Sequence, residues 1–149
     1  MLGGLDNEAE VASQNLQLIS KDLQIKYHKG SKLNQNAEPA SEIDRKIQSD
    51  AIDMINNFKP QLLFVAFGNP KQEIWVHEHY QKLNIGGAMA VGGAFRYTAG
   101  LSSLPPKWMS DIGLEWLYRL STEPHRIGRI WNAVIIFPLK LLFHNILKK

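Results

Sequence analysis

The chain has 149 residues, enough for one domain of ordinary size, with 44% hydrophobic and 21% charged residues. These proportions are typical of a packed globular protein and exclude a disordered, collagen-like or low-complexity chain. The absence of cysteine excludes disulfides, cysteine-ligated zinc, iron–sulfur clusters and thiol nucleophiles, and is compatible with a reducing cytoplasm. Residues 104–149 hold seven Lys and Arg against three Asp and Glu, so we expect an anionic partner there: nucleic acid, a membrane surface or a phosphorylated substrate.

The first part of the chain alternates between helical and strand patterns. A helix is expected over about residues 8–20, and the alternation of apolar and polar residues over 23–27 predicts a strand. Ser41 followed by Asp44 is a helix-start signal, and the apolar stripe from Ile43 to Phe58 gives that helix a buried face.

Two apolar runs further along are typical of strands buried in a parallel sheet. These are residues 62–67 and 88–91. Between them, Asn69 is placed to cap a helix that begins at Pro70 and continues to about Leu83. The alternation of strands and helices predicts an α/β fold in which helices flank a parallel sheet.

From Leu104 onward the pattern becomes helical, which predicts two parts. Residues 1–103 form the α/β part and residues 104–149 a basic, apolar helical appendage. Within the appendage we expect short helices over 106–110 and 114–120 and a long helix from about Arg126.

Polar side chains gather where the first apolar run ends and a helix begins. Ligands of parallel sheets bind beyond the carboxyl ends of the strands, and a helix N-terminus attracts phosphate. Lys71 adds a positive charge for a diphosphate, and Gln72 can hydrogen-bond a base or a sugar. The candidate binding residues are Asn69, Lys71, Gln72 and Glu73. The alternative is an ordinary capped turn with exposed side chains.

A pair of glycines follows the second apolar run. Gly92 and Gly93 would let a ligand approach the backbone closely, although a tight turn also explains them. Neither this segment nor the first is a dinucleotide or P-loop fingerprint. His77 and His79 are two residues apart on one predicted helix and point in different directions, so they cannot share a metal ion. We therefore expect chemistry without a metal.

The appendage carries three arginines whose spacing would bring their guanidinium groups together. Arg119, Arg126 and Arg129 suit diphosphate oxygens, although most surface arginines have no such role. The apolar residues after Arg126, with a basic stripe along them, predict a helix lying in an anionic membrane interface. The alternative is a helix buried in the core or in an oligomer.

Five blocks of sequence together resemble the WecG/TagA/CpsF family of bacterial glycosyltransferases (glycosyltransferase family 26), specifically its C-terminal portion. Each block is weak alone, and their order and spacing carry the resemblance. They are Phe67-Gly68-Asn69-Pro70-Lys71-Gln72-Glu73-Ile74-Trp75, Val91-Gly92-Gly93-Ala94-Phe95 with Ala99-Gly100, Pro106-Lys107-Trp108-Met109, Gly113-Leu114-Glu115-Trp116-Leu117-Tyr118-Arg119-Leu120, and Glu123-Pro124-x-Arg126-x-x-Arg129.

The resemblance implies a Rossmann-like α/β fold and a hexosyltransferase-type enzyme with no cofactor. Such an enzyme transfers an N-acetylhexosamine, typically N-acetylmannosamine, from a UDP-sugar to a polyprenyl-diphosphate-linked acceptor. The products belong to teichoic acids and cell-surface polysaccharides. The implied location is cytoplasmic, peripheral on the inner face of the plasma membrane.

The resemblance also implies a general base in a strand–helix portion that family members carry before the Gly3-Gly4 turn. We therefore assign no catalytic base in this sequence. The alternative interpretation is a catalytically incomplete remnant that binds a nucleotide sugar or associates with membrane. Nucleic-acid binding is not expected, because basic and aromatic residues do not alternate on a predicted sheet. Association with further copies of the chain is left open.

Overall fold

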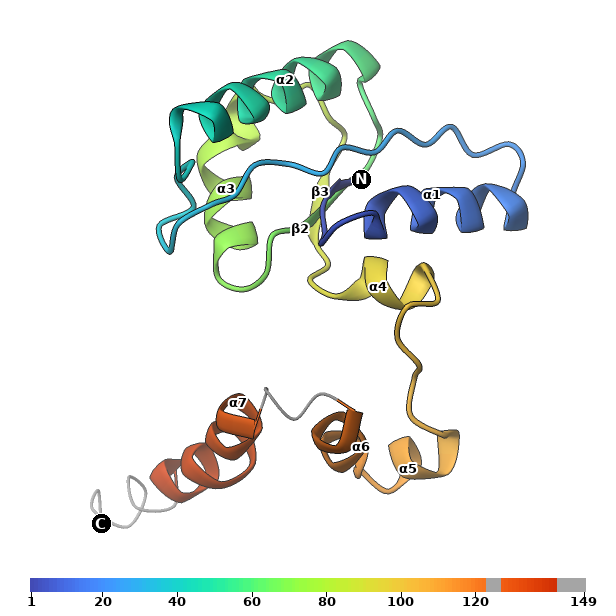
Figure 1. The fold of residues 1–149 in the computed structure, drawn as a ribbon, viewed down its shortest axis with the longest axis vertical. Coiled ribbons are helices and arrows are strands. Elements are labelled where there is room, and N and C mark those ends of the chain that lie inside the picture. The colour runs from blue at the N-terminus through green and yellow to red at the C-terminus, as the bar shows by residue number, and fades with distance from the viewer. Residues whose placement is uncertain (123–126, 142–149) are drawn as a thin grey trace. The chain divides into compact units, whose positions relative to one another are not determined.

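The computed structural model describes residues 1–122 and 127–141, and the chain divides into two compact units, Met1–Ser103 and Leu104–Lys149. In the first unit, three strands form a parallel sheet in the order β1-β2-β3 (Figure 1). The strands are β1 (Leu2–Gly3), β2 (Leu63–Ala66) and β3 (Ala88–Ala90). This confirms the predicted α/β class with a parallel sheet.

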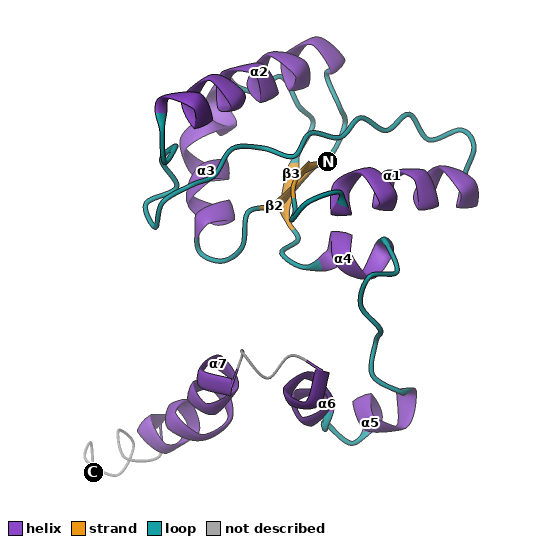
Figure 2. Ribbon diagram, viewed as in Figure 1, coloured by secondary structure: helices purple, strands orange, loops and turns teal. Residues whose placement is uncertain are grey.

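Helices cover both faces of this sheet, as Figure 2 shows. α1 (Glu8–Ile19) and α4 (Ala94–Thr98) lie on one face. α2 (Glu42–Phe58) and α3 (Lys71–His79) lie on the other. The predicted flanking helices are thus present, together with α4, which the sequence patterns did not predict.

The alternation of side chains along β2 explains the two layers. Leu63 and Val65 are buried against α2 and α3, where the fully buried Trp75 completes the packing. Phe64 and Ala66 point to the opposite face and pack near Phe95. A strand with apolar side chains on both faces belongs inside a parallel sheet, as the apolar run predicts.

The start of α2 follows the predicted capping pattern. The Ser41 hydroxyl oxygen accepts a hydrogen bond from the Asp44 backbone amide at 3.1 Å and donates to the Asp44 carboxylate at 2.6 Å. Ala51 and Ile55 of the predicted stripe are buried, whereas Ile43, in the first turn of the helix, is 75% exposed.

The prediction of a strand over residues 23–27 is wrong. This described segment is extended but belongs to no strand, and a single bridge from Leu2 to His28 joins the chain beside it to β1. A ladder needs a neighbour of similar length, and β1 has only two residues. Alternation of apolar and polar residues therefore does not by itself make a strand of this segment.

The boundaries of α3 also differ from the prediction. Pro70 is the N-cap residue and its side chain makes no capping bond, so the expected roles of Asn69 as cap and Pro70 as first helical residue are wrong by one position. The α-helix ends at His79 and gives way to a 3-10 turn over Tyr80–Lys82.

β3 is less buried than its apolar sequence predicts. Met89 is 53% exposed, and Ala90 is exposed as well. β3 is an outer strand of the described sheet, so it lacks the second neighbouring strand that covers β2. An apolar run does not by itself distinguish an outer strand from a central one.

The second unit is helical where it is described. It contains α5 (Lys107–Asp111), α6 (Glu115–Thr122) and α7 (Ile127–Trp131), and α7 continues into a π-helical stretch, Asn132–Ile136. Helical backbone then reaches residue 141. No helix in the described part of the chain is long and apolar enough to cross a membrane.

Candidate functional site

The loops that follow the three strands meet at one edge of the sheet, because parallel strands end at the same side. They contain Gly4, directly after β1, Gly68–Pro70 after β2 and Gly92-Gly93 after β3. The structure thereby brings the two sequence-predicted segments together and adds the loop after β1, which the sequence motifs did not assign to the site.

Gln72 is the side chain that joins the loops after β2 and β3. It is only 5% exposed, and its amide oxygen accepts a hydrogen bond from the Gly92 backbone amide at 3.0 Å. Its amide nitrogen donates to the Glu73 carboxylate at 2.9 Å. Gly92 has φ +52°, a conformation that favours glycine. Gln72 therefore fixes the spacing of two loops that are 20 residues apart in sequence.

Lys71 brings a positive charge to the same edge. Its ammonium group donates to the Leu33 carbonyl oxygen at 3.2 Å, which ties the polar loop before α2 to the first turn of α3. A carbonyl leaves the charge of the ammonium uncompensated, and an ammonium has three donors. The lysine can therefore still bind an anionic ligand.

The first turn of α3 offers fewer free amides than the sequence suggests. The Gln72 amide donates to the Gly68 carbonyl oxygen at 3.0 Å. Pro70 has no amide hydrogen to donate. A ligand at this helix start would therefore depend on the Lys71 side chain more than on a row of backbone donors.

Glu73 places a carboxylate beside Gln72. The hydrogen bond from Gln72 is the main cause that lowers the pKa of Glu73 below its ordinary value, with smaller contributions from its own amide and from Asn69. The side chain is exposed, so solvent screens its charge. As an ionised acceptor it suits the hydroxyl or N–H groups of a ligand and not a phosphate.

Two side chains near this edge were not among the predicted site residues. Glu8, in the first turn of α1, is 8% exposed, and its carboxylate accepts a hydrogen bond from the Leu5 amide at 3.0 Å. Arg96 follows the Gly92-Gly93 turn, and its Nε atom is buried without a hydrogen-bond partner among the described residues. An acidic residue just after a Gly-Gly turn, at a helix start, is the signal that points to Glu8.

The histidines of α3 have different surroundings. The His79 ring stacks on Trp75 with 4.6 Å between centroids, and its Nδ1 lies 2.9 Å from the Trp75 carbonyl oxygen. Its Nε2 lies 3.2 Å from the Gln48 amide nitrogen. His77 is exposed. His79 is thus part of the packing between α2 and α3.

The three predicted arginines belong to the second unit. Arg119 lies in α6 and Arg129 in α7, whereas Arg126 lies outside the described residues. Their joint action on a diphosphate stays a prediction.

Comparison with known proteins identifies relatives along nearly the whole chain. N-acetylglucosaminyldiphosphoundecaprenol N-acetyl-beta-D-mannosaminyltransferases of Staphylococcus aureus strains NCTC 8325, COL and MRSA252 are each 29% identical to it over 141 residues. The match covers 95% of this chain and 50% of each relative, so the chain spans about half their length. The sequence profile of the glycosyl transferase WecG/TagA/CpsF family matches residues 1–149. The chain belongs to this family.

Proposed function

We propose that this chain forms the nucleotide-sugar side of a glycosyltransferase that moves an N-acetylhexosamine, N-acetylmannosamine, from a UDP-sugar to a polyprenyl-diphosphate-linked sugar. The observation that carries the proposal is the Gln72–Gly92 hydrogen bond, which joins two loops at the carboxyl edge of the sheet. Ligands of open α/β sheets bind at that edge. The names of the S. aureus relatives supply the sugar and the acceptor.

Transfer of a sugar from a UDP-sugar requires the protein to stabilise UDP as the leaving group. An acceptor hydroxyl attacks the anomeric carbon with inversion, the bond to the diphosphate breaks, and negative charge grows on the departing diphosphate. The Lys71 ammonium would meet that charge, the Glu73 carboxylate would accept hydrogen bonds from the sugar or base, and the Asn69 amide could accept or donate them. Gly92 and Gly93 would allow close approach. Arg119, Arg126 and Arg129 would complete the diphosphate site, and the general base is not assigned to this chain.

Calorimetry with UDP in EDTA tests the location of the site. We expect UDP to bind the intact chain without a divalent metal, and Gln72→Ala to weaken binding about tenfold because the Gly92 loop loses its anchor. Gln81→Ala, an exposed glutamine after α3, is the matched control and should leave affinity unchanged. UDP that fails to bind, or that binds only with metal, contradicts the proposal.

A second comparison isolates the role of Lys71. If its ammonium binds the diphosphate, Lys71→Gln should weaken UDP about tenfold and leave uridine nearly unchanged. Equal losses for UDP and uridine would mean that the substitution damages the loop and that the lysine does not bind phosphate.

A catalytically incomplete, ligand-binding chain is the second candidate, because the chain spans half the length of its relatives. Incubation with UDP-N-acetylmannosamine and a polyprenyl-diphosphate-linked N-acetylglucosamine separates the two. Disaccharide formation supports the enzyme. UDP binding without product supports the binding-only chain.

We place the second unit on the inner face of the cytoplasmic membrane. Trp131 and Phe137 are 58% and 60% exposed, and Lys140 on the same helical segment is exposed too. Apolar burial and about 1 kcal/mol per basic residue would hold such a helix on anionic lipid. Deletion of residues 130–149 should abolish sedimentation with phosphatidylglycerol vesicles, and high salt should weaken that of the intact chain. Unchanged sedimentation after the deletion contradicts this placement.

A further inference from the structure

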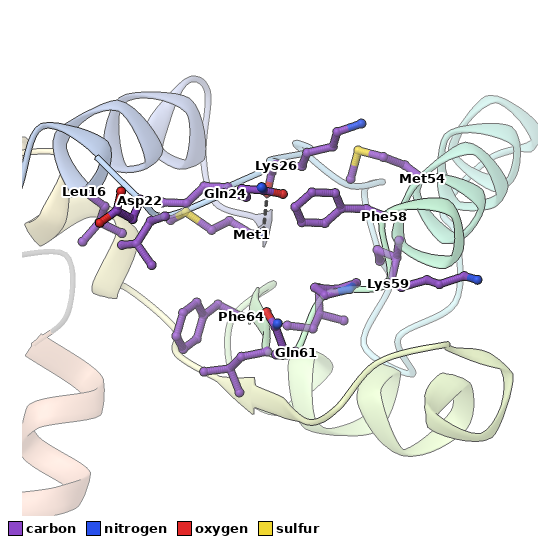
Figure 3. A pocket seen from close by; sticks show the side chains of 16 residues that line it. Met1, Leu16, Asp22, Gln24, Lys26, Met54, Phe58, Lys59, Gln61 and Phe64 are labelled. Carbon is purple, nitrogen blue, oxygen red and sulfur yellow. Dashed lines mark hydrogen bonds between the residues drawn. The ribbon is translucent and has the colours of Figure 1, made fainter. Parts of the chain in front are cut away.

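A cavity of about 730 Å³ opens at the amino edge of the sheet, beside the start of β2 and opposite the candidate site (Figure 3). Leu16, Met54 and Phe58 give it an apolar wall, and Lys26 and Lys59 among its lining residues are exposed. Exposed charges are solvated and need no ligand to neutralise them. A partly buried cation without a partner lies instead at the carboxyl edge, in α4.

This cation is Arg96, three residues after Gly93. Its Nε atom is buried and has no hydrogen-bond partner, and its guanidinium group forms no ion pair with any residue that the structure describes. Buried polar groups without a partner are rare in folded proteins, and burying an unpaired charge is costly. Arg96 therefore lacks an acceptor that the described part of the chain does not supply.

The carboxylates of the same edge are bonded to other groups. Glu8 accepts a hydrogen bond from the Leu5 amide, and Glu73 accepts one from the Gln72 amide nitrogen. Neither carboxylate forms an ion pair with a cation among the described residues. The positive charges at this edge are thus left for a ligand.

The helices after β2 and β3 place the two cations of this edge, Lys71 and Arg96, on opposite faces of the sheet. β2 leads into α3, which packs with α2 on one face, and β3 leads into α4, which packs with α1 on the other (Figure 2). β2 and β3 are neighbouring strands, so the chain leaves two adjacent strands toward opposite faces. Ligands of open α/β sheets bind at such a switch point, outside the carboxyl ends of the strands.

The loops at this switch point leave room for a ligand. A Cβ added to Gly68 would meet no atom within 4 Å, and one added to Gly92 would come no closer than 3.9 Å to the Gln72 amide nitrogen. The hydrogen bond between Gln72 and Gly92 holds the two loops together. Lys71, beside Gln72, and Arg96, one turn after the second loop, therefore flank the same pair of loops.

We propose that Arg96 is a further cation of the candidate site and that it binds a diphosphate group together with Lys71, one from each face of the sheet. The guanidinium fork of arginine binds two phosphate oxygens at once, which suits it to this ligand. The inference rests on the proposed function, in which the UDP-sugar and the polyprenyl-linked acceptor both carry a diphosphate. The chemistry that Arg96 recognises is the diphosphate, whichever of the two substrates supplies it.

Calorimetry on the full chain with UDP, geranyl diphosphate, inorganic pyrophosphate and uridine tests the proposal. We expect Arg96→Gln to weaken pyrophosphate and at least one of the two organic diphosphates about tenfold, and to leave uridine unchanged because it carries no phosphate. Arg96→Lys keeps the charge without the fork and should lose less. Arg45→Gln, which removes an exposed arginine of α2, is the matched control and should change no affinity. A loss confined to UDP assigns the diphosphate to the donor, and a loss confined to geranyl diphosphate assigns it to the acceptor.

The outcomes separate this inference from the proposed function. Unchanged affinity of Arg96→Gln for every diphosphate that binds the intact chain overturns the inference and leaves the proposed function standing. Failure of UDP to bind the intact chain contradicts the proposed function, and pyrophosphate that binds and depends on Arg96 then still supports the inference. Binding of no diphosphate overturns both.

Thermal unfolding separates ligand binding from a purely structural role of Arg96. Replacing a partly buried, unpaired cation should not lower the unfolding midpoint of the ligand-free chain, whereas it should reduce the rise in midpoint that pyrophosphate causes. A lower midpoint without ligand, together with equal losses of affinity for UDP and uridine, would mean that the arginine supports the loop after β3, and overturns the proposal.

Discussion

At the carboxyl edge of the sheet side chains close the gaps between loops, whereas at the amino edge backbone groups lie without partners. Gln72 bonds to Gly92, Glu8 bonds to Leu5, and the Gly4 amide donates to the Ala66 carbonyl oxygen at 2.9 Å. At the other edge, the amides of residues 24–27 donate to no acceptor in the described part of the chain.

The two edges of the sheet are therefore stabilised by different kinds of contact. The loops at the carboxyl edge are organised by side-chain and backbone contacts within this chain. At the amino edge, apolar side chains line a cavity, and few backbone hydrogen bonds join the described segment 23–27 to β1. α2 connects the two edges, since Asp44 in its first turn binds the polar loop at Lys32, and Met54 and Phe58 in its last turns line a cavity at the amino edge.

The largest effect is expected from Gly3→Ala at the carboxyl edge. Gly3 has φ +90°, and an added Cβ would lie 2.8 Å from the Ala66 carbonyl oxygen, which is backbone and cannot easily move. Left-handed strain and overpacking together should lower the free energy of unfolding by about 3 kcal/mol. Urea unfolding followed by circular dichroism measures it.

Gly100→Ala separates the two causes. Gly100 also has a positive φ, +72°, but an added Cβ would meet no atom within 4 Å. Gly100→Ala should lower the free energy of unfolding by only about 1 kcal/mol, because it introduces backbone strain without a steric clash. If both substitutions cost the same, close packing of β1 against β2 does not organise the carboxyl edge.

At the amino edge, the Met1 ammonium makes stability depend on pH. Burial lowers the pKa of this group from 8.0 to about 6. The unfolded chain therefore binds more protons between those values, and the free energy of unfolding should rise by about 2–3 kcal/mol from pH 5.5 to pH 8.5. Denaturant titrations at the two pH values measure this change.

An N-acetylated chain is the control for that pH dependence. Burial also lowers the pKa of His28, which changes stability in the same direction at lower pH, and acetylation leaves that contribution in place. The difference between the two chains is the contribution of Met1. A difference near zero would mean that water solvates the Met1 ammonium in the folded chain.

The sequence predicted what depends on local patterns and missed what depends on absent or distant neighbours. Ser41 and Asp44 lie three residues apart at the start of one helix, so the cap was predicted from a local pattern and is confirmed. The strand predicted over residues 23–27 is not formed, because pairing depends on a neighbouring strand that a local pattern does not reveal, and a single bridge from Leu2 to His28 is all that lies beside this segment among the described residues. The bond between Gln72 and Gly92 could not be predicted, because only the fold brings these two residues together. The positions of the motifs at strand ends were predictable, but not the side chain that links them.

The smallest effect is expected at Ser41, whose contacts lead toward the candidate site. Asp44, which Ser41 holds, accepts a hydrogen bond from the Lys32 amide at 2.9 Å, and the next carbonyl, that of Leu33, receives the Lys71 ammonium. Ser41→Ala should lower the free energy of unfolding by about 1 kcal/mol through the lost cap. Ser49→Ala, at an exposed position within the same helix, should be neutral or slightly stabilising because alanine is the better helix former. Thermal unfolding of both variants measures the difference, and hydrogen exchange at Lys32 should quicken only in Ser41→Ala. Unchanged exchange there would mean that the polar loop keeps its position without α2, and that the carboxyl edge is less dependent on that helix than its hydrogen bonds indicate.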